Sequence, residues 1–459
     1  MATLTFWGGV ETVTGSKYLL ESEGKRVLID CGLFQGMKEL RERNWQAVPF
    51  VAKDLDAIVL THAHIDHSGF LPRMIVEGFR GPIYCSKGTA ELLKILLPDS
   101  ARLQEEEAEY RNKHQLTQHN PALPLYSEED AYRTLEFLRP VLHEENAFTV
   151  APGITAQLYV AGHLLGSRFI RFTLAPSGRT VLFSGDLGQQ NPLILRDPVD
   201  PPSADYVLVE STYGDRLHDE IPPKEALAPI IQRAAKRSGT ILIPAFAVGR
   251  TQELLYVLRQ LEDEGRIPVL PVYVDSPMAV EATTVYQRLL EEYDPTLLKN
   301  RTLPLRTQKC HFAASRGESR RLNDVEGVHI ILSAAGMMTG GRILHHAQRV
   351  LPDPESTVIF VGYQGRGTTG RRVLDGESHV KIFKQMYPVH CHIERVEGFS
   401  SHPDYRDILA WLKDIPTPPR CLFITHGEPE ASKSLAERID ASFGWKTHLP
   451  HYGETFPLD

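Results

Sequence analysis

The sequence predicts an α/β protein in which one domain is interrupted by the insertion of another. Its 459 residues exceed the size at which a single hydrophobic core usually stops growing. A strand-rich beginning gives way, between about residues 224 and 390, to alternating helical stretches and apolar strands, which is typical of a parallel sheet. We therefore expect a first domain made of residues 1–210 and 391–459 and an inserted domain at residues 211–390.

Short strands separated by glycine-containing turns make up the beginning of the expected first domain. Apolar patterns predict strands at residues 4–8, 17–21 and 26–30, and a short buried strand at residues 57–60 leads into a histidine-rich loop. Residues 87–138 combine helix-forming and charged residues, so we expect solvent-exposed helices there. Further strands are expected at residues 155–160, 169–174, 180–183 and 206–210.

The inserted domain is expected to contain a parallel sheet. Apolar strands are predicted at residues 240–243, 269–274, 329–332 and 357–361, with helical stretches between them. After the insertion, a strand at residues 421–425 is followed directly by a histidine, which repeats the strand-then-histidine order of the first part. The last residues therefore belong with the first domain.

Composition and charge are those of an ordinary globular protein. Hydrophobic residues make up 42% and charged residues 24%, and no run approaches the roughly 20 apolar residues of a membrane helix. The first residues lack the basic and apolar regions of a secretion signal, so we expect a cytoplasmic protein without membrane association. Because the net charge is −8, an anionic substrate must be attracted by local charge, including bound metal.

The five cysteines are widely spread along the chain and include no C-x-x-C pair. Their odd number and spacing argue against a disulfide framework and against a thiolate zinc site. We expect all of them to be buried, reduced thiols.

The segment His62-x-His64-x-Asp66-His67 is the strongest functional signal in the sequence. It places four metal-ligand side chains within six residues at the end of a predicted strand, where a rigid sheet can present them. On an extended or looped backbone, His62 and His64 point to one side and Asp66 and His67 can turn to another. One loop can thus serve two metals. The alternative is a polar surface loop, but 19 histidines among 459 residues rarely cluster this way by chance.

Two further candidate ligands, His163 and Asp186, each follow a predicted strand and are flanked by glycines. Glycine allows the backbone to approach a crowded site closely. Taken alone, either residue would more often be a turn residue than a ligand.

Together with Asp30 and His426, these segments resemble the metallo-β-lactamase superfamily in residue type and in order along the chain. The resemblance implies a four-layered αββα sandwich and two Zn²⁺ ions per chain. It also implies a hydrolytic reaction, because two zinc ions can activate a shared water.

The resemblance also implies which residues hold each ion. One zinc ion would be bound by His62, His64 and His163. The other would be bound by Asp66, His67 and His426. Asp186 would bridge the two ions, and Asp30 would orient a ligand histidine from the outer shell.

The insertion and the motifs around it resemble the β-CASP branch of this superfamily, and most closely its bacterial ribonuclease form. The motifs are Glu210, at the end of the strand before the insertion, and His402 in Ser400-Ser401-His402-Pro403. Many relatives have a small residue where this chain has Pro403. The resemblance implies a Rossmann-like inserted sheet, and it implies that Glu210 orients His402, which protonates the leaving 3′-oxygen. We expect Asp66 to be a catalytic residue together with Glu210 and His402. The alternatives for Glu210 and His402 are capping or surface roles.

Glycine-rich loops in the insertion are candidate contacts for RNA phosphates. The candidate residues share a position at the start of such a loop or within it: Ser333, Arg366, Arg371 and Ser400. Because any Rossmann-like sheet needs such turns, a purely structural role explains these loops at least as well.

The resemblance thus implies a zinc-dependent ribonuclease acting on single-stranded RNA, as an endonuclease or a 5′-to-3′ exonuclease, with a homodimer among the expected assemblies. The preference for RNA over DNA rests on the resemblance alone. A small-molecule metallohydrolase, such as a thioesterase or lactonase with the insertion as a lid, is the main alternative. A catalytically silent RNA-binding scaffold is another, against which the complete ligand set argues.

Overall fold

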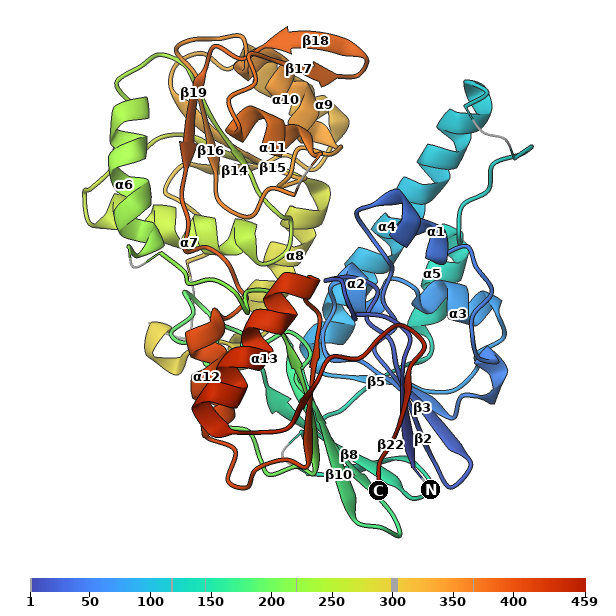
Figure 1. Cartoon of the computed structure of the whole chain (residues 1–459). Coiled ribbons are helices and arrows are strands. Elements are labelled where there is room, and N and C mark those ends of the chain that lie inside the picture. Colours follow the sequence, from blue (N-terminus) through green and yellow to red (C-terminus); the bar gives the residue numbers. More distant parts are fainter. Residues whose placement is uncertain (1, 117–118, 145, 220, 299–303, 366) are drawn as a thin grey trace. The chain divides into compact units, whose positions relative to one another are not determined.

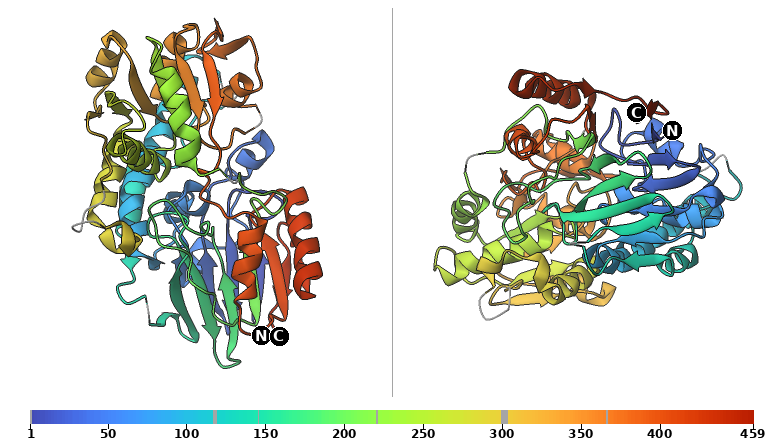
Figure 2. Two further views of the ribbon diagram at one scale, coloured as in Figure 1. Left: turned by 90° about the vertical axis from the view of Figure 1, so that its left-hand side faces the viewer. Right: turned by 90° about the horizontal axis from the view of Figure 1, so that it is seen from below.

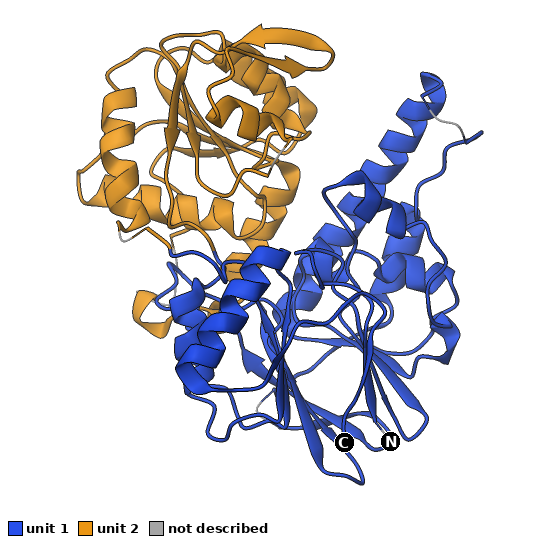
Figure 3. Ribbon diagram, viewed as in Figure 1, with its two compact units in different colours: residues 1–217, 401–459 blue, residues 218–400 orange. Residues whose placement is uncertain are grey.

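The computed structural model describes residues 2–116, 119–144, 146–219, 221–298, 304–365 and 367–459. The chain forms two compact units (Figure 3): unit 1 comprises Met1–Leu217 and Ser401–Asp459, and unit 2 comprises His218–Ser400. The boundaries expected from the sequence lie several residues before these. Ser211 and Thr212 remain hydrogen-bonded to the C-terminal part of unit 1, and the last strand of the unit 2 sheet ends only at Arg395.

The first sheet of unit 1 has the strand order β22-β1-β2-β3-β4-β5-β6. Strand β22 pairs antiparallel with β1, so the N and C ends lie side by side (Figure 2). Strands β3 to β6 pair in parallel, which places their carboxyl ends at one edge. The strands are β1 (Thr3–Phe6), β2 (Tyr18–Ser22), β3 (Lys25–Ile29), β4 (Ala57–Val59), β5 (Ile83–Cys85), β6 (Leu138–Pro140) and β22 (Thr455–Pro457).

The second sheet of unit 1 has the order β21-β20-β11-β10-β9-β8-β7. Its centre joins the two sequence segments of the unit, because β11 pairs in parallel with β20. The strands are β7 (Phe148–Ala151), β8 (Ile154–Val160), β9 (Arg168–Leu174), β10 (Arg179–Phe183), β11 (Tyr206–Glu210), β20 (Cys421–Thr425) and β21 (Thr447–His448).

The two sheets pack face to face through apolar side chains, and helices cover their outer faces (Figure 1). Phe6 and Ile29 of the first sheet share one core with Phe183 and Phe423 of the second. The predicted four-layered sandwich is thereby confirmed. Its helices are α1 (Lys38–Arg43), α2 (Ile65–Ser68), α3 (Leu71–Val76), α4 (Lys87–Lys113), α5 (Glu128–Leu135), α12 (Tyr405–Lys413) and α13 (Pro429–Phe443), with a 3-10 turn η1 (Ala52–Asp54).

The stretch expected to be helical at residues 87–138 contains two helices with irregular chain between them. Pro121 and Pro124 lie in the interruption, where proline cannot donate the helical hydrogen bond. Helix α5 then starts at a capping box in which Ser127 and Asp130 bond each other's backbone amides.

Unit 2 is a six-stranded parallel sheet with the order β14-β13-β15-β12-β16-β19, flanked by helices. The strand expected from residue 269 begins at Val272, because Pro271 has no amide proton for the ladder. Strands β14 and β19 and the hairpin β17–β18 were not predicted. The strands are β12 (Thr240–Pro244), β13 (Val272–Asp275), β14 (Cys310–Phe312), β15 (His329–Ser333), β16 (Thr357–Phe360), β17 (His379–Ile382), β18 (Gln385–Pro388) and β19 (His392–Arg395).

The helices of unit 2 follow its strands, as the alternation in the sequence predicted. They are α6 (Pro223–Ala234), α7 (Arg250–Asp263), α8 (Pro277–Arg288), α9 (Arg316–Arg321), α10 (Arg342–Val350) and α11 (Thr369–Leu374), with 3-10 turns η2 (Leu290–Glu292), η3 (Pro295–Leu297) and η4 (Leu322–Asp324). No helix in the described ranges combines the length and the apolar character that crossing a bilayer requires. All five cysteines are buried free thiols, as predicted.

Candidate metal centre

The histidine-rich segment follows β4 and contains a helical turn. His62 and His64 lie on extended backbone, whereas Asp66 and His67 lie on the short helix α2, which corrects the expectation of a continuous loop. The Ser68 hydroxyl donates to the carbonyls of Ala63 and His64 and so fixes the start of this turn. The helical turn places Asp66 and His67 in a separate group of donors, although the ring centroids of His62 and His67 are only 4.1 Å apart.

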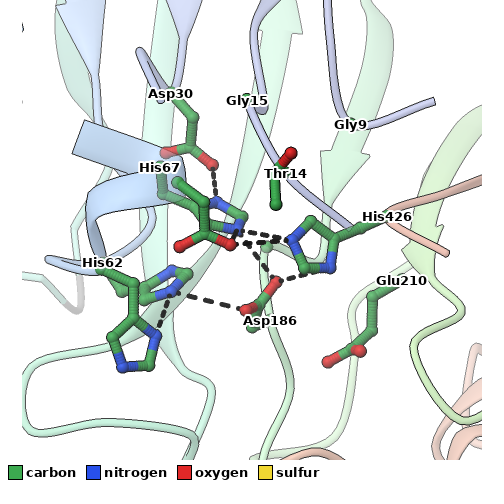
Figure 4. A network of polar contacts seen from close by, with 12 residues as sticks. Gly9, Thr14, Gly15, Asp30, His62, His67, Asp186, Glu210 and His426 are labelled. Atoms are coloured by element: carbon green, nitrogen blue, oxygen red, sulfur yellow. Dashed lines mark hydrogen bonds and ion pairs between the residues drawn. The ribbon is translucent and has the colours of Figure 1, made fainter. Parts of the chain in front are cut away.

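The remaining candidate ligands come from strand ends of the second sheet. His163 follows β8, Asp186 follows β10, and His426 follows β20 with a positive φ of 48°. Non-glycine residues adopt this left-handed backbone rarely, and such residues are concentrated at functional sites. The structure therefore brings all seven predicted ligands to one place in unit 1 (Figure 4).

One donor set consists of atoms from His62, His64, His163 and Asp186, which lie within 4.8 Å of one another. The Nδ1 atom of His64 lies 3.1 Å from His62 Nε2 and 3.2 Å from His163 Nε2. Asp186 Oδ2 lies 3.5 Å from His62 Nε2 and 3.6 Å from His163 Nε2. Three imidazole nitrogens and one carboxylate oxygen thus point at a common centre.

A second donor set consists of Asp66, His67 and His426, and the other oxygen of Asp186 faces it. His67 Nε2 lies 3.0 Å from His426 Nε2 and 3.2 Å from Asp186 Oδ1. Asp66 Oδ2 lies 3.4 Å from His426 Nε2. Figure 4 shows Asp186 between the two sets, with His62 on one side and His426 on the other, as a bridging carboxylate requires.

The chemistry of these donors fits zinc. His67 Nδ1 lies 2.8 Å from Asp30 Oδ2, and His67 Nε2 lies 3.0 Å from His426 Nε2, a contact between two ring nitrogens that a shared cation would stabilise. Asp186 Oδ1 is buried and receives no hydrogen bond from the described residues. Neutral imidazole nitrogens and carboxylate oxygens in sets of three or four are the usual ligands of zinc.

The protonation states of the donors also fit a metal site. Burial and the neighbouring imidazoles lower the pKa of His62 and His163 well below the ordinary value, so both rings are neutral at pH 7. Burial alone would raise the pKa of Asp186, but the imidazoles of His426 and His67 hold it well below its usual range. Metal ligands must be deprotonated, and His62, His163 and Asp186 meet that condition. Burial by itself lowers the pKa of His67, but the carboxylates of Asp186 and Asp30 raise it well above the ordinary value, so this ring must release a proton when a metal binds.

Three groups outside the donor sets orient ligand imidazoles. Asp30 Oδ2 lies 2.8 Å from His67 Nδ1, and the Thr61 amide and hydroxyl both donate to Asp30 at 2.8 Å. The Thr61 hydroxyl also lies 3.0 Å from His62 Nδ1, and the Thr212 hydroxyl lies 3.2 Å from His426 Nδ1. The sequence predicted Asp30 but missed both threonines, because a hydroxyl residue beside a ligand motif is too common to be a signal.

We expect Asp30→Asn to weaken zinc binding by roughly 10–100-fold, measured by competition with a chromophoric chelator. The substitution presents an amide N–H₂ to the Thr61 donors or to His67, so one donor loses its acceptor. The matched control is Asp56→Asn on the same sheet, where Asp56 accepts from Lys25 Nζ and the Arg26 amide at 2.9 Å. Equal zinc affinity in both variants would show that Asp30 does not support the site.

A histidine–carboxylate pair lies beside the first donor set. Glu210 is fully buried at the end of β11, and its Oε2 lies 3.0 Å from His402 Nδ1. The Leu187 amide donates to Glu210 Oε1 at 2.7 Å. Burial by itself lowers the pKa of His402, but the Glu210 carboxylate raises it to about 9. Glu210 therefore engages Nδ1 of this partly exposed ring.

Three of the four predicted phosphate contacts lie in the described part of unit 2. Ser333 is buried, and its hydroxyl donates to the Asp275 carbonyl at 3.0 Å, so its role is structural rather than phosphate binding. The exposed Arg371 forms an ion pair with Asp375 at 2.8 Å on α11. Ser400 is half-buried at the end of unit 2, and Arg366 lies outside the described residues.

Comparisons with known proteins agree with the geometry. The model of the metallo-beta-lactamase superfamily matches residues 12–228, that of the Beta-Casp domain matches residues 251–373, and that of the Zn-dependent metallo-hydrolase RNA specificity domain matches residues 386–450. These matches follow one another along the chain and together cover both compact units.

Relatives match along almost the whole length of the chain. Ribonuclease TTHA0252 of Thermus thermophilus is 36% identical over 98% of this chain and 99% of its own. Transcription termination factor FttA of Methanocaldococcus jannaschii is 29% identical over 97% of this chain and 70% of its own. A crystal structure of a protein of unknown function from Enterococcus faecalis shares the fold with a TM-score of 0.56, at 15% identity over 99% of both chains.

Proposed function

The chain belongs to the β-CASP family of the metallo-β-lactamase superfamily, and from this premise we propose that it is a ribonuclease with two Zn²⁺ ions that hydrolyses single-stranded RNA. One observation carries the proposal. Two donor sets share Asp186, and His402, held by Glu210, has its Nδ1 only 4.0 Å from Asp186 Oδ2. A site for an activated water and an acid for a leaving group are therefore adjacent.

The residues of the chain divide the work of phosphodiester hydrolysis. Two zinc ions bound to these donor sets would supply a hydroxide at neutral pH and stabilise charge on the phosphoryl group. His402 carries a proton on Nε2 and donates it to the 3′-oxygen as the P–O bond breaks. Glu210 holds the Nδ1 proton and stabilises the imidazolium, which keeps His402 charged until that transfer.

Asp66 has a second role besides metal binding. Its side chain is 19% exposed, whereas that of Asp186 is 2% exposed. Asp66 therefore lies on the open side of its donor set, where an ionised oxygen can accept a hydrogen bond from the attacking water and orient it. The imidazole of His426 lowers the pKa of Asp66 to about 2 in spite of burial, so this acceptor is ionised throughout the neutral range.

A time course with single-stranded RNA labelled at either end tests the proposal. We expect cleavage by zinc-loaded protein, loss of cleavage after chelation, and recovery when zinc is restored. Labelled mononucleotides released first from the 5′ end identify a 5′-to-3′ exonuclease, and internal fragments identify an endonuclease. Intact RNA together with rapid turnover of lactone or thioester substrates would replace this proposal with the small-molecule hydrolase.

A further inference from the structure

The hairpin β17–β18 of unit 2 has an unusual turn. Ile382 pairs with Gln385, so Phe383 and Lys384 alone form the two-residue connection. Their φ angles are 47° and 72°, both in the left-handed region. Tight hairpins of this kind normally place asparagine and glycine at these positions, because other side chains are strained there. Strain of this kind is typically retained where a side chain has a function.

The hairpin is firmly anchored below its turn. Val380 and Ile382 are buried in the apolar core of unit 2. The Tyr387 hydroxyl accepts from Gln348 Nε2 of α10 at 2.7 Å and donates to Gln385 Oε1 at 2.8 Å. The turn residues are therefore displayed on a rigid support rather than on a mobile loop.

The side chains on this support are apolar or cationic. Phe383 is 53% exposed and Met386 is 56% exposed, and the His345 ring of α10 packs beside Phe383 at 4.8 Å between centroids. Lys381 and Lys384 are exposed beside them. Residues 378–393 contain no acidic residue although the whole chain has a net charge of −8. The local charge is thus opposite to that of the protein as a whole.

We propose that the hairpin face, defined by His345, Lys381, Phe383, Lys384 and Met386, binds single-stranded RNA through residues other than those of the metal centre. This inference rests on the proposed ribonuclease function. An exposed aromatic ring stacks on an unpaired base, and adjacent lysines contact the phosphates on either side. The nearby Asp375 and Glu377 are paired with Arg371 and Arg372. A cationic face on an acidic protein is complementary to a polyanion, which favours RNA over a second protein as the occupant.

The double substitution Phe383→Asn with Lys384→Gly tests the proposal, because it installs the residues that this turn favours while it removes the ring and one cation. In a His402→Ala background, which slows cleavage by roughly 10²–10⁴-fold, we expect fluorescence anisotropy to show about tenfold weaker binding of an unstructured 30-nucleotide RNA. The slope of log affinity against log salt should shrink by about 0.7. With His402 restored, hydrolysis of bis(p-nitrophenyl) phosphate should be unchanged, and Tm should be equal or higher.

The control is Tyr132→Ala, which removes a 55% exposed aromatic ring of α5 and should leave RNA affinity unchanged. Unchanged affinity in the double variant would overturn the proposal. A change from dimer to monomer in sedimentation, without loss of RNA affinity, would reassign the face to contact between copies. If the parent chain hydrolyses neither RNA nor the small phosphodiester, the proposed function fails. The anisotropy comparison would still decide whether this face binds RNA.

Discussion

Asp186→Ala is expected to abolish RNA hydrolysis and to reduce the zinc content from two ions per chain to one or none. The two oxygens of Asp186 face different donor sets, with Oδ2 at 3.5 Å from His62 Nε2 and Oδ1 at 3.2 Å from His67 Nε2. Its loss should cost more than the roughly 10²–10³-fold in kcat that follows removal of a single electrostatic contact. Metal analysis after gel filtration and initial rates on labelled RNA measure both effects.

The matched control for Asp186→Ala is Asp275→Ala in unit 2. Asp275 is also fully buried and pairs with a histidine, at 2.6 Å from His346 Nε2. Its loss should lower Tm, because buried donors are left unpaired, but zinc content should stay at two. Retention of two tightly bound ions by Asp186→Ala would contradict the bridging role.

His402→Ala is expected to keep both zinc ions and to lower kcat on RNA by roughly 10²–10⁴-fold. The two donor sets do not include His402, so only the leaving-group acid is removed. The loss should be much smaller for a substrate whose leaving group needs no proton, such as a p-nitrophenyl phosphodiester. Full activity of His402→Ala on RNA would contradict the assignment.

A pH profile separates the role of Glu210 from simple packing. The carboxylate raises the pKa of His402, so Glu210→Gln should lower that pKa. The acid form is then lost at lower pH, and the alkaline limb of the rate profile moves toward neutrality. Zinc bound near His402 would act alike on the parent chain and on Glu210→Gln. The direction of the difference in the pKa of His402 between them is therefore expected to stay the same. The control is His448→Ala, which breaks a 2.6 Å pair with Glu454 elsewhere in unit 1 and should leave cleavage unchanged.

The strands could be predicted from the sequence where an apolar run is continuous and leads directly into a functional residue. Strands such as β4, β11 and β20 appear as short apolar runs that lead into functional residues. Strand β14 has only three residues, and the hairpin β17–β18 exposes half of its residues, so neither leaves a clear apolar period. The break between α4 and α5 depends on Pro121 and Pro124, and the apolar pattern of residues 87–138 does not reveal it.

The candidate site was predictable for residues whose chemistry is rare and whose order is distinctive. Histidines and aspartates after strand ends indicated the seven candidate donors, and the family resemblance implied the pair of Glu210 and His402; the structure brings the members of each group close together. The backbone of Asp66 and His67 was not predictable, since a single helical turn has no period to detect. Thr61, Thr212 and the inward hydroxyl of Ser333 depend on contacts between distant segments, which local patterns do not encode.

The pairing of β11 with β20 has a consequence for synthesis of the protein. Translation delivers His62, His64, His163 and Asp186 early, but His402 and His426 only after the whole of unit 2 has been made. The centre of the second sheet stays open until residues 421–425 emerge from the ribosome. A polypeptide that ends before residue 402 therefore lacks both the proposed proton donor and one proposed metal ligand, and we expect it to be inactive on RNA.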